Sequence, residues 1–297
     1  MSGGRGLRAV LVGMALGALG LLPAGCGSGG PGQITLGYLT WDENVAVSNL
    51  TKVLLEKDLG YENVELKRAG DVVPAYKMVG NSEADAFQDA WMPNQREILG
   101  NVEGDVELLD PWFKGTTRFS VATPAYMNAS SIDQLNSTGA EHIIGIEAGT
   151  PMMEKLSEAV IPEYGLEQKL VQAPTEAMLA EVDKRYRNRE EFAFVAWSPH
   201  WMNEAYDFDY LADPKGALGN LTEPADVTTL VRGDLAEEDP VAYAFMDRLE
   251  LTEAQVYGLQ NEIEAAGEPV EGAKNWLRDN RDVVEPWVEA AEKAREG

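Results

Sequence analysis

The chain has 297 residues, of which 44% are hydrophobic, so it can bury the core of one large domain or of two modest lobes. It carries 24 basic and 50 acidic residues, and the resulting net charge of −26 argues against nucleic acid as a partner. The acids are spread along the chain, which is typical of a highly charged, solvated surface. Their field mildly favours cationic or zwitterionic ligands over anions.

The first residues have the pattern of a bacterial export signal. Arg5 and Arg8 precede an apolar run of about 14 residues, which is the length of a signal-peptide core and too short for a membrane-spanning helix. The run leads to Leu22-Pro23-Ala24-Gly25-Cys26, which resembles the lipoprotein signal in which a cysteine becomes lipid-modified. Pro23 departs from that signal, which usually has Leu, Val or Ile at this place.

Cys26 is the only cysteine, so an exported chain forms no internal disulfide, and lipidation gives this thiol a purpose. We expect residues 1–25 to be a lipoprotein signal peptide and residues 26–32 to be a flexible tether. The mature protein is then extracytoplasmic, held to the outer face of the cytoplasmic membrane by a lipid on Cys26. Plain secretion with an unmodified cysteine is the alternative.

The mature chain alternates strands with helices. Residues 34–38 predict a strand, the apolar residues between Val47 and Leu55 recur at helical spacing, and residues 64–66 predict a second strand. Such a β-α-β unit normally joins parallel strands. Further strands are predicted at residues 85–87, 142–146 and 192–196, and helices from about residue 236 to the end. The fold class is therefore α/β.

Signatures of catalysis and metal binding do not stand out. The sequence contains no Gly-x-Ser-x-Gly elbow, no P-loop and no Gly-x-Gly-x-x-Gly after a strand. The two histidines, His142 and His200, do not have metal-ligand spacing. We expect no catalytic residues, no metal and no cofactor.

Tryptophan carries more information than any other residue type here. Of the seven tryptophans, Trp41, Trp91, Trp197 and Trp201 follow strand-like stretches. In α/β sheets ligands bind at the carboxyl ends of strands, so these indoles either cap the core or form the wall of a site. A box of indoles holds a quaternary ammonium group by cation–π attraction.

Several motifs resemble one family, the glycine betaine/proline betaine/choline substrate-binding proteins of ABC importers. The resemblance covers nearly the whole mature chain. It rests on Trp197-Ser198-Pro199-His200-Trp201 with the downstream Leu211-Ala212-Asp213-Pro214-Lys215, on Ala90-Trp91-Met92-Pro93, on Gly145-Ile146-Glu147-Ala148-Gly149, and on Pro124-Ala125-Tyr126-Met127 with Ser131-Ile132-Asp133-Gln134-Leu135.

The resemblance implies a two-lobed, Venus-flytrap fold in which each lobe is a mixed sheet flanked by helices and the ligand lies in the cleft. We expect residues 33–122 and 223–297 to form one lobe and residues 123–222 the other, with crossings near residues 121–124 and 221–224. Carried over from the family, the cage residues are Trp41, Trp91 and Trp197, with Tyr126 as a weaker wall. Trp201 is expected to pack, and His200 to orient its loop or contact the ligand.

The other end of the ligand has more than one candidate partner. Family members that bind betaine often have a histidine at the positions that here hold Gln95 and Arg96, so either residue is a candidate for binding a ligand carboxylate. Choline-type members place an acid near the first tryptophan, which makes Glu43 a candidate too. Betaine and choline therefore both stay open at this point.

The leading hypothesis is a monomeric binding lipoprotein that delivers a glycine betaine-like quaternary amine to an ABC permease. One alternative is a choline- or carnitine-specific protein of the same fold. Another is a sensory lipoprotein that has lost transport. A different class of function is an enzyme acting on a quaternary amine with Glu43 or His200 as base.

Overall fold

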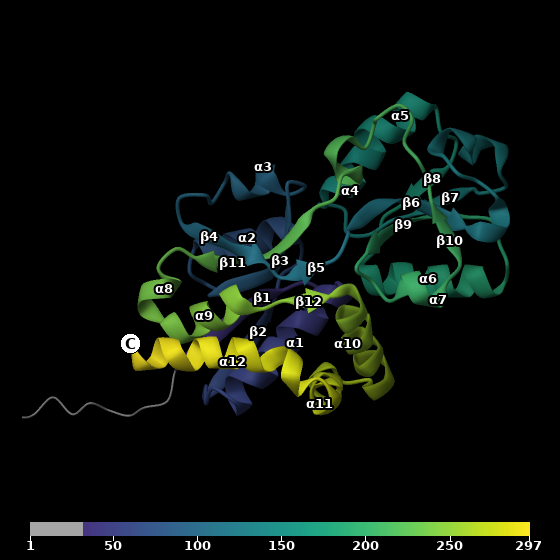
Figure 1. The fold of residues 1–297 in the computed structure, drawn as a ribbon. Coiled ribbons are helices and arrows are strands. Elements are labelled where there is room, and N and C mark those ends of the chain that lie inside the picture. Colours follow the sequence, from purple (N-terminus) through teal and green to yellow (C-terminus); the bar gives the residue numbers. More distant parts are fainter. Residues whose placement is uncertain (1–31) are drawn as a thin grey trace, which may run out of the picture.

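The computed structural model describes residues 32–297, so the expected signal peptide and Cys26 lie outside the described residues. This part of the chain forms two lobes, each built on a five-stranded mixed sheet with helices packed against it (Figure 1). The α/β class and the two-lobed architecture predicted from the sequence are confirmed. No helix within residues 32–297 is both long and apolar enough to cross a membrane.

The first lobe contains the sheet with strand order β2-β1-β3-β11-β4. Its strands are β1 (Gln33–Tyr38), β2 (Asn63–Arg68), β3 (Ala86–Met92), β4 (Val106–Pro111) and β11 (Asp226–Arg232). β1 pairs in parallel with β2 and β3, whereas β11 runs antiparallel to β3 and β4. The parallel pairing of β1 with β2 across a helix confirms the β-α-β unit predicted for the start of the mature chain.

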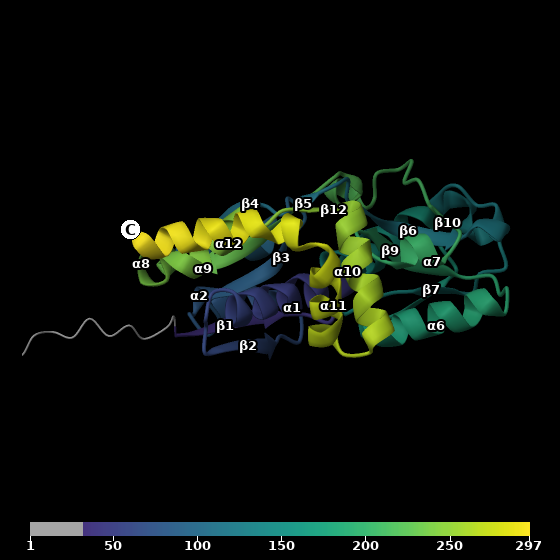
Figure 2. The same cartoon turned by 60° about the horizontal axis from the view of Figure 1, so that its bottom comes forward.

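Eight helices of the described residues belong to the first lobe. They are α1 (Asp42–Lys57), α2 (Val72–Gly80), α3 (Arg96–Leu99), α8 (Leu235–Glu238), α9 (Pro240–Arg248), α10 (Glu253–Ala266), α11 (Pro269–Asp279) and α12 (Arg281–Glu296). α1 buries Leu50 and Leu54 completely, and α10 starts with a capping box between Thr252 and Gln255. Figures 1 and 2 show α12 lying along α9 at the outer end of this lobe.

The second lobe contains the sheet with strand order β10-β6-β9-β7-β8. Its strands are β6 (Arg118–Pro124), β7 (His142–Ile144), β8 (Lys169–Val171), β9 (Ala193–Ser198) and β10 (Phe208–Tyr210). Its helices are α4 (Pro151–Lys155), α5 (Ile161–Tyr164), α6 (Thr175–Arg187) and α7 (Met202–Ala205), with a π-helical turn at Leu156–Val160 between α4 and α5. Three 3₁₀ turns complete the lobe, at Ala125–Met127, Ile132–Ser137 and Gly219–Thr222. The apolar run 192–196 predicted as a strand is fully buried.

The chain crosses between the lobes earlier than the sequence suggested. Residues 121–124 were expected to form the first crossing, but they lie within β6, which pairs antiparallel with β9 and β10. Val121 and Ala122 are fully buried there, so their apolar character serves the second core rather than a linker. The first crossing therefore precedes Arg118, and the return falls between Thr222 and Asp226. A short parallel pair, β5 (Phe113–Lys114) and β12 (Leu251–Thr252), lies near the first crossing.

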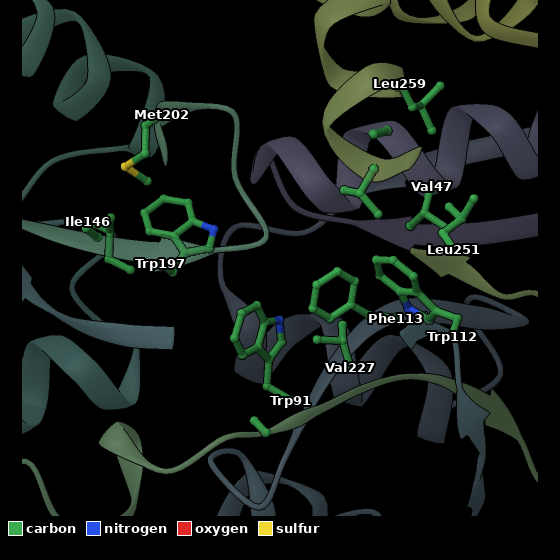
Figure 3. Packing of buried hydrophobic residues seen from close by; sticks show 14 of the residues in the cluster. Val47, Trp91, Trp112, Phe113, Ile146, Trp197, Met202, Val227, Leu251 and Leu259 are labelled. Carbon is green, nitrogen blue, oxygen red and sulfur yellow. The ribbon is translucent and has the colours of Figure 1, made fainter. Parts of the chain in front are cut away.

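Strand ends from both lobes meet at the junction. Trp41 directly precedes α1 after β1, and Trp91 lies near the end of β3, which is parallel to β1. Trp197 lies near the end of β9 in the other lobe. Figure 3 shows Trp91 and Trp197 on elements of opposite lobes, with their indoles close to the junction. The carboxyl ends of the strands thus bring three predicted indoles to one place.

Candidate ligand-binding site

The two lobes enclose a cavity of about 420 Å³, counting the space open to solvent at its mouth. The first lobe contributes Trp41, Glu43, Trp91, Asn94 and Gln95 to its wall. The second lobe contributes Phe119, Ile146, Thr150, Pro151, Trp197 and Leu221. Most of this wall is aromatic or aliphatic, with a few polar groups, which is the usual composition of a small-molecule site.

Four aromatic rings form the main walls of the cavity. Trp91 and Phe119 have ring centroids 6.1 Å apart and are tilted by 48°, and Phe119 meets Trp197 edge-to-face at 6.4 Å. Trp41, which is 8% exposed, adds the fourth ring. Ring faces are electron-rich, so several of them around one space attract an organic cation.

Phe119 was not singled out in the sequence, because a crossing was expected directly after it, at residues 121–124, and no strand was predicted there. In the structure it lies in β6, directly opposite Trp197 of β9. Antiparallel neighbours on one face of a sheet contact each other, so this register places the two rings side by side. The signal that could have found it is the alternation of apolar residues through β6.

Each of the three cavity indoles donates its N–H to a carboxylate. Trp41 donates to Glu147 at 3.2 Å, Trp91 to Asp89 at 2.8 Å, and Trp197 to Glu43 at 3.0 Å. The bonds of Trp41 and Trp197 join the lobes, since each donor and its acceptor lie on opposite lobes. These bonds satisfy the one polar group of each indole and fix its orientation.

Two of these carboxyl groups, Glu43 of the cavity wall and Asp89, are buried and lie close enough to interact electrostatically. Burial raises the pKa of Glu43 well above its ordinary value, the Asp89 carboxylate raises it further, and the hydrogen bond from Trp197 opposes the shift. Burial also raises the pKa of Asp89 to about 7. Burial thus disfavours the charged form of both carboxyl groups, whereas a cation in the cavity favours it.

In the turn between β3 and α3, Asn94 and Gln95 line the cavity and their neighbour Arg96 does not. Gln95 lines the cavity, and its side-chain oxygen accepts bonds from the Tyr76 hydroxyl at 2.8 Å and from the Trp91 amide at 3.1 Å. Arg96 begins α3, is exposed and does not line the cavity. Asn94, which the sequence did not single out, lines it. Of the two residues predicted as candidates for the ligand carboxylate, the structure thus brings Gln95 to the cavity wall and leaves Arg96 outside it.

Tyr126 and His200 also lie outside the cavity wall. The Tyr126 hydroxyl donates to the backbone oxygen of Glu190 within the second lobe, and the Arg189 guanidinium stacks over its ring at 4.8 Å. The structure therefore does not bring Tyr126, predicted as a weaker wall of the cage, to this cavity. His200 is fully buried and packs edge-to-face against Trp197 at 4.6 Å, so it orients the loop rather than lining the cavity.

A second set of contacts, outside the cavity, joins the lobes around Asp42. His200 Nε2 lies 3.0 Å from Asp42 Oδ2, and the Trp201 indole donates to Asp42 Oδ1 at 2.8 Å. We call Asp42, His200 and Trp201 the outer clasp. On another side of the junction, the Ser198 hydroxyl donates to Glu253 at 3.0 Å. Gly149 packs so closely on Asp71 of the first lobe that an added Cβ would collide with that carboxylate.

Metal binding has no support in the described part of the chain, because residues 32–297 contain no group of three or more His, Cys, Asp or Glu side chains able to hold an ion. Within the same residues, no Lys, Arg or His side chain lines the cavity. Its polar groups are carboxyl, amide and hydroxyl groups. The cavity can thus enclose a small molecule with a cationic, apolar surface.

Comparison with known proteins identifies the class to which this fold and cavity belong. The sequence profile of the OpuAC family, described as the substrate-binding domain of the ABC-type glycine betaine transport system, matches residues 32–279. The chain belongs to this family, as its tryptophan motifs predicted. It is a family of binding domains, so the expectation that the chain is not an enzyme is confirmed.

Individual relatives support the same class. The chain is 32% identical, over 164 residues, to the glycine betaine/carnitine transport binding protein GbuC of Listeria monocytogenes serotype 1/2a (strain 10403S). That match covers 54% of this chain, and the chain spans about half the length of that relative, 52%.

Two solved structures resemble most of the described fold. Lactococcal OpuAC in its closed-liganded conformation with glycine betaine superposes with a TM-score of 0.77 at 31% identity, covering 87% of this chain and 100% of that one. The glycine betaine/L-proline-binding protein ProX of Borrelia burgdorferi gives a TM-score of 0.78 at 25% identity, covering 88% and 99%.

Proposed function

We propose that this protein captures a glycine betaine-like quaternary ammonium compound in the aromatic cavity and delivers it to an ABC permease. The observation that carries the proposal is the set of rings from both lobes, Trp41, Trp91, Phe119 and Trp197, around one enclosed space. A ligand held between lobes stabilises their closed arrangement, and release follows when they separate.

The chemistry of the wall favours a methylated cation. A quaternary ammonium has no N–H to donate, so ring faces rather than hydrogen-bond acceptors recognise it. Each well-placed ring contributes roughly 2 kcal/mol once the cavity is desolvated. Glu43 lines the cavity and Asp89 is buried near it, so ionisation of either group places negative charge next to the rings and is favoured by a bound cation. A primary amine would instead leave its N–H groups without partners among the rings.

The names of the relatives favour glycine betaine over choline. GbuC is named for glycine betaine and carnitine, and lactococcal OpuAC was solved with glycine betaine. Choline is the second candidate, because Glu43 lines the cavity and no cationic side chain of residues 32–297 does so. Carnitine, which keeps a carboxylate, is a further candidate that rests on the name of GbuC. The hydroxyl group of choline, in place of the carboxylate of glycine betaine, would avoid repulsion from Glu43.

The partners follow from the family and from the first residues of the sequence. We propose an extracytoplasmic monomer that is anchored through a lipid on Cys26 and that docks on the permease of an ABC importer. Metabolic labelling with a radioactive fatty acid tests the anchor. The label is expected on the wild-type chain and not on the Cys26→Ser variant. Equal labelling of both would contradict a lipid anchor on Cys26.

A ligand panel tests the binding function. Isothermal titration calorimetry with glycine betaine, proline betaine, choline, carnitine and tetramethylammonium is expected to give saturable heat for glycine betaine. Proline and glycine, which lack the trimethylammonium group, serve as negative controls. The absence of a response to all five methylated ligands at millimolar concentration would contradict the proposal.

A further inference from the structure

Asn94 stands apart among the polar residues on the cavity wall. It lies in the turn between β3 and α3, three residues after the cage residue Trp91. Both polar atoms of its side-chain amide, Oδ1 and Nδ2, are buried and have no hydrogen-bond partner within residues 32–297. A buried amide without partners costs about 1–3 kcal/mol, so such a group calls for an explanation.

Each of the other polar side chains of the wall has a partner for at least one of its polar atoms. Glu43 accepts from the Trp197 indole, Gln95 accepts from Tyr76 and Trp91, and the Thr150 hydroxyl donates to the Glu147 backbone oxygen. Asn94 is therefore the wall residue whose full hydrogen-bonding capacity is still open. The turn that carries it is held in place, because the Gln95 amide donates to the Trp91 oxygen at 2.9 Å and the Arg96 amide to the Pro93 oxygen at 3.1 Å.

We propose that Asn94 is a specificity-determining residue whose side-chain NH₂ donates a hydrogen bond to the ligand carboxylate while the rings hold the ammonium group. This inference rests on the proposed function of a betaine-type ligand. An uncharged donor suits this cavity, because its wall contains the carboxyl group of Glu43 and, within residues 32–297, no Lys or Arg to pair with a ligand carboxylate. The raised pKa of Glu43 lessens the negative charge that the carboxylate would meet.

The decisive substitution is Asn94→Asp, which keeps the size of the side chain and exchanges the NH₂ donor for a carboxylate oxygen. It is expected to weaken glycine betaine binding at least about tenfold, equivalent to about 1.4 kcal/mol, because two carboxylates then face each other. Choline, whose hydroxyl can donate to the new carboxylate, is expected to bind as well as to the wild type or better. The ratio of betaine to choline affinity is thus the measured quantity.

Tetramethylammonium separates the polar end from the cage. It has an ammonium head and no oxygen, so Asn94→Ala is expected to leave its affinity within about twofold while weakening glycine betaine several-fold. Retained binding of tetramethylammonium also shows that each variant is folded and that its cavity is intact. Arg96→Ala, in the same turn but exposed, is the matched control and is expected to leave all affinities unchanged.

Three outcomes would contradict the proposal, and they can be told apart. If both Asn94 variants bind glycine betaine as tightly as the wild type, the role of Asn94 is overturned and the cage proposal stands. If they weaken tetramethylammonium as much as glycine betaine, Asn94 supports the wall and does not select the ligand. If the wild type binds none of the three ligands, the proposed function falls and the role of Asn94 falls with it.

Discussion

Two indole–carboxylate pairs join the lobes side by side, yet they differ in their surroundings. Trp197 donates to Glu43 at 3.0 Å and Trp201 donates to Asp42 at 2.8 Å, so the acceptors are neighbours in the sequence and the donors are four residues apart. Glu43 is 1% exposed and Trp197 is 3% exposed. The Asp42 side chain is 29% exposed, and Trp201 is half-buried.

Burial decides what each pair can do. In the inner pair, the carboxyl group is desolvated, its pKa is raised, and the indole ring forms a wall of the cavity. In the outer pair, water competes for the carboxylate, so the bond contributes little energy and mainly fixes how the lobes meet. A tryptophan and an acidic residue thus form part of the cavity wall in the inner pair, and part of the outer clasp in the outer pair. Each prediction below tests one side of this contrast.

The largest effect is expected from the inner indole. Trp197→Ala removes one ring of the cage and one bond between the lobes, so the affinity for glycine betaine is expected to fall at least about tenfold, or about 1.4 kcal/mol. Calorimetry measures it, with Trp201→Phe as the control that keeps the aromatic ring of the clasp. Equal losses of affinity in the two variants would contradict the predicted difference between the inner and the outer pair.

The next effect concerns the pH dependence of stability. The pKa of Asp89 is raised to about 7 by burial, and that of Glu43 is raised by burial and by Asp89. A carboxyl whose pKa is higher in the folded state contributes stability that is complete below its ordinary pKa of about 4 and is lost as the pH rises through the folded value. The groups that face this pair are Asp42 and Tyr76.

Removing one of the two ionisable groups should flatten this dependence. The free energy of unfolding of Asp89→Asn, measured in urea, is expected to rise relative to that of the wild type as the pH goes from 4 to 8. Asn keeps an oxygen acceptor for the Trp91 indole, so the variant changes the charge and not the hydrogen bond. Glu62→Gln, at an exposed residue, serves as control. A constant difference between Asp89→Asn and wild type across this range would contradict the raised pKa.

The smallest effect is expected from the outer clasp. Asp42→Asn leaves Trp201 an oxygen acceptor but weakens the contact with His200, so ligand affinity is expected to fall by about threefold or less. A loss as large as that of Trp197→Ala would show that the clasp, and not the cage, dominates closure.

The sequence predicted the parts of the site that depend on local pattern. Trp41, Trp91 and Trp197 each follow or end an apolar strand. Strand ends meet at the junction of an α/β fold, so the sequence predicted where these indoles lie. The family motifs added the class of ligand. The α/β class followed from alternation of periodicity along the chain.

The rest of the site depends on contacts between distant residues. Asp42 and His200 are 158 positions apart, so no local pattern could pair them. Gln95 and Arg96 are neighbours with equally plausible chemistry, and only the start of α3 shows that Gln95 faces the cavity while Arg96 faces solvent. Asn94 carries no sequence signal, because its significance is the absence of a partner within the folded residues 32–297.

The central claim is that the cavity recognises the positive charge of a trimethylammonium group. Calorimetry with glycine betaine and with 3,3-dimethylbutanoate, in which a carbon replaces the charged nitrogen, tests it most directly because the two have nearly the same shape. We predict saturable binding of glycine betaine and at least about hundredfold weaker binding of the carbon analogue, since the cation–π attraction is lost. Equal affinity for the two would show that the rings bind shape alone and would contradict the account.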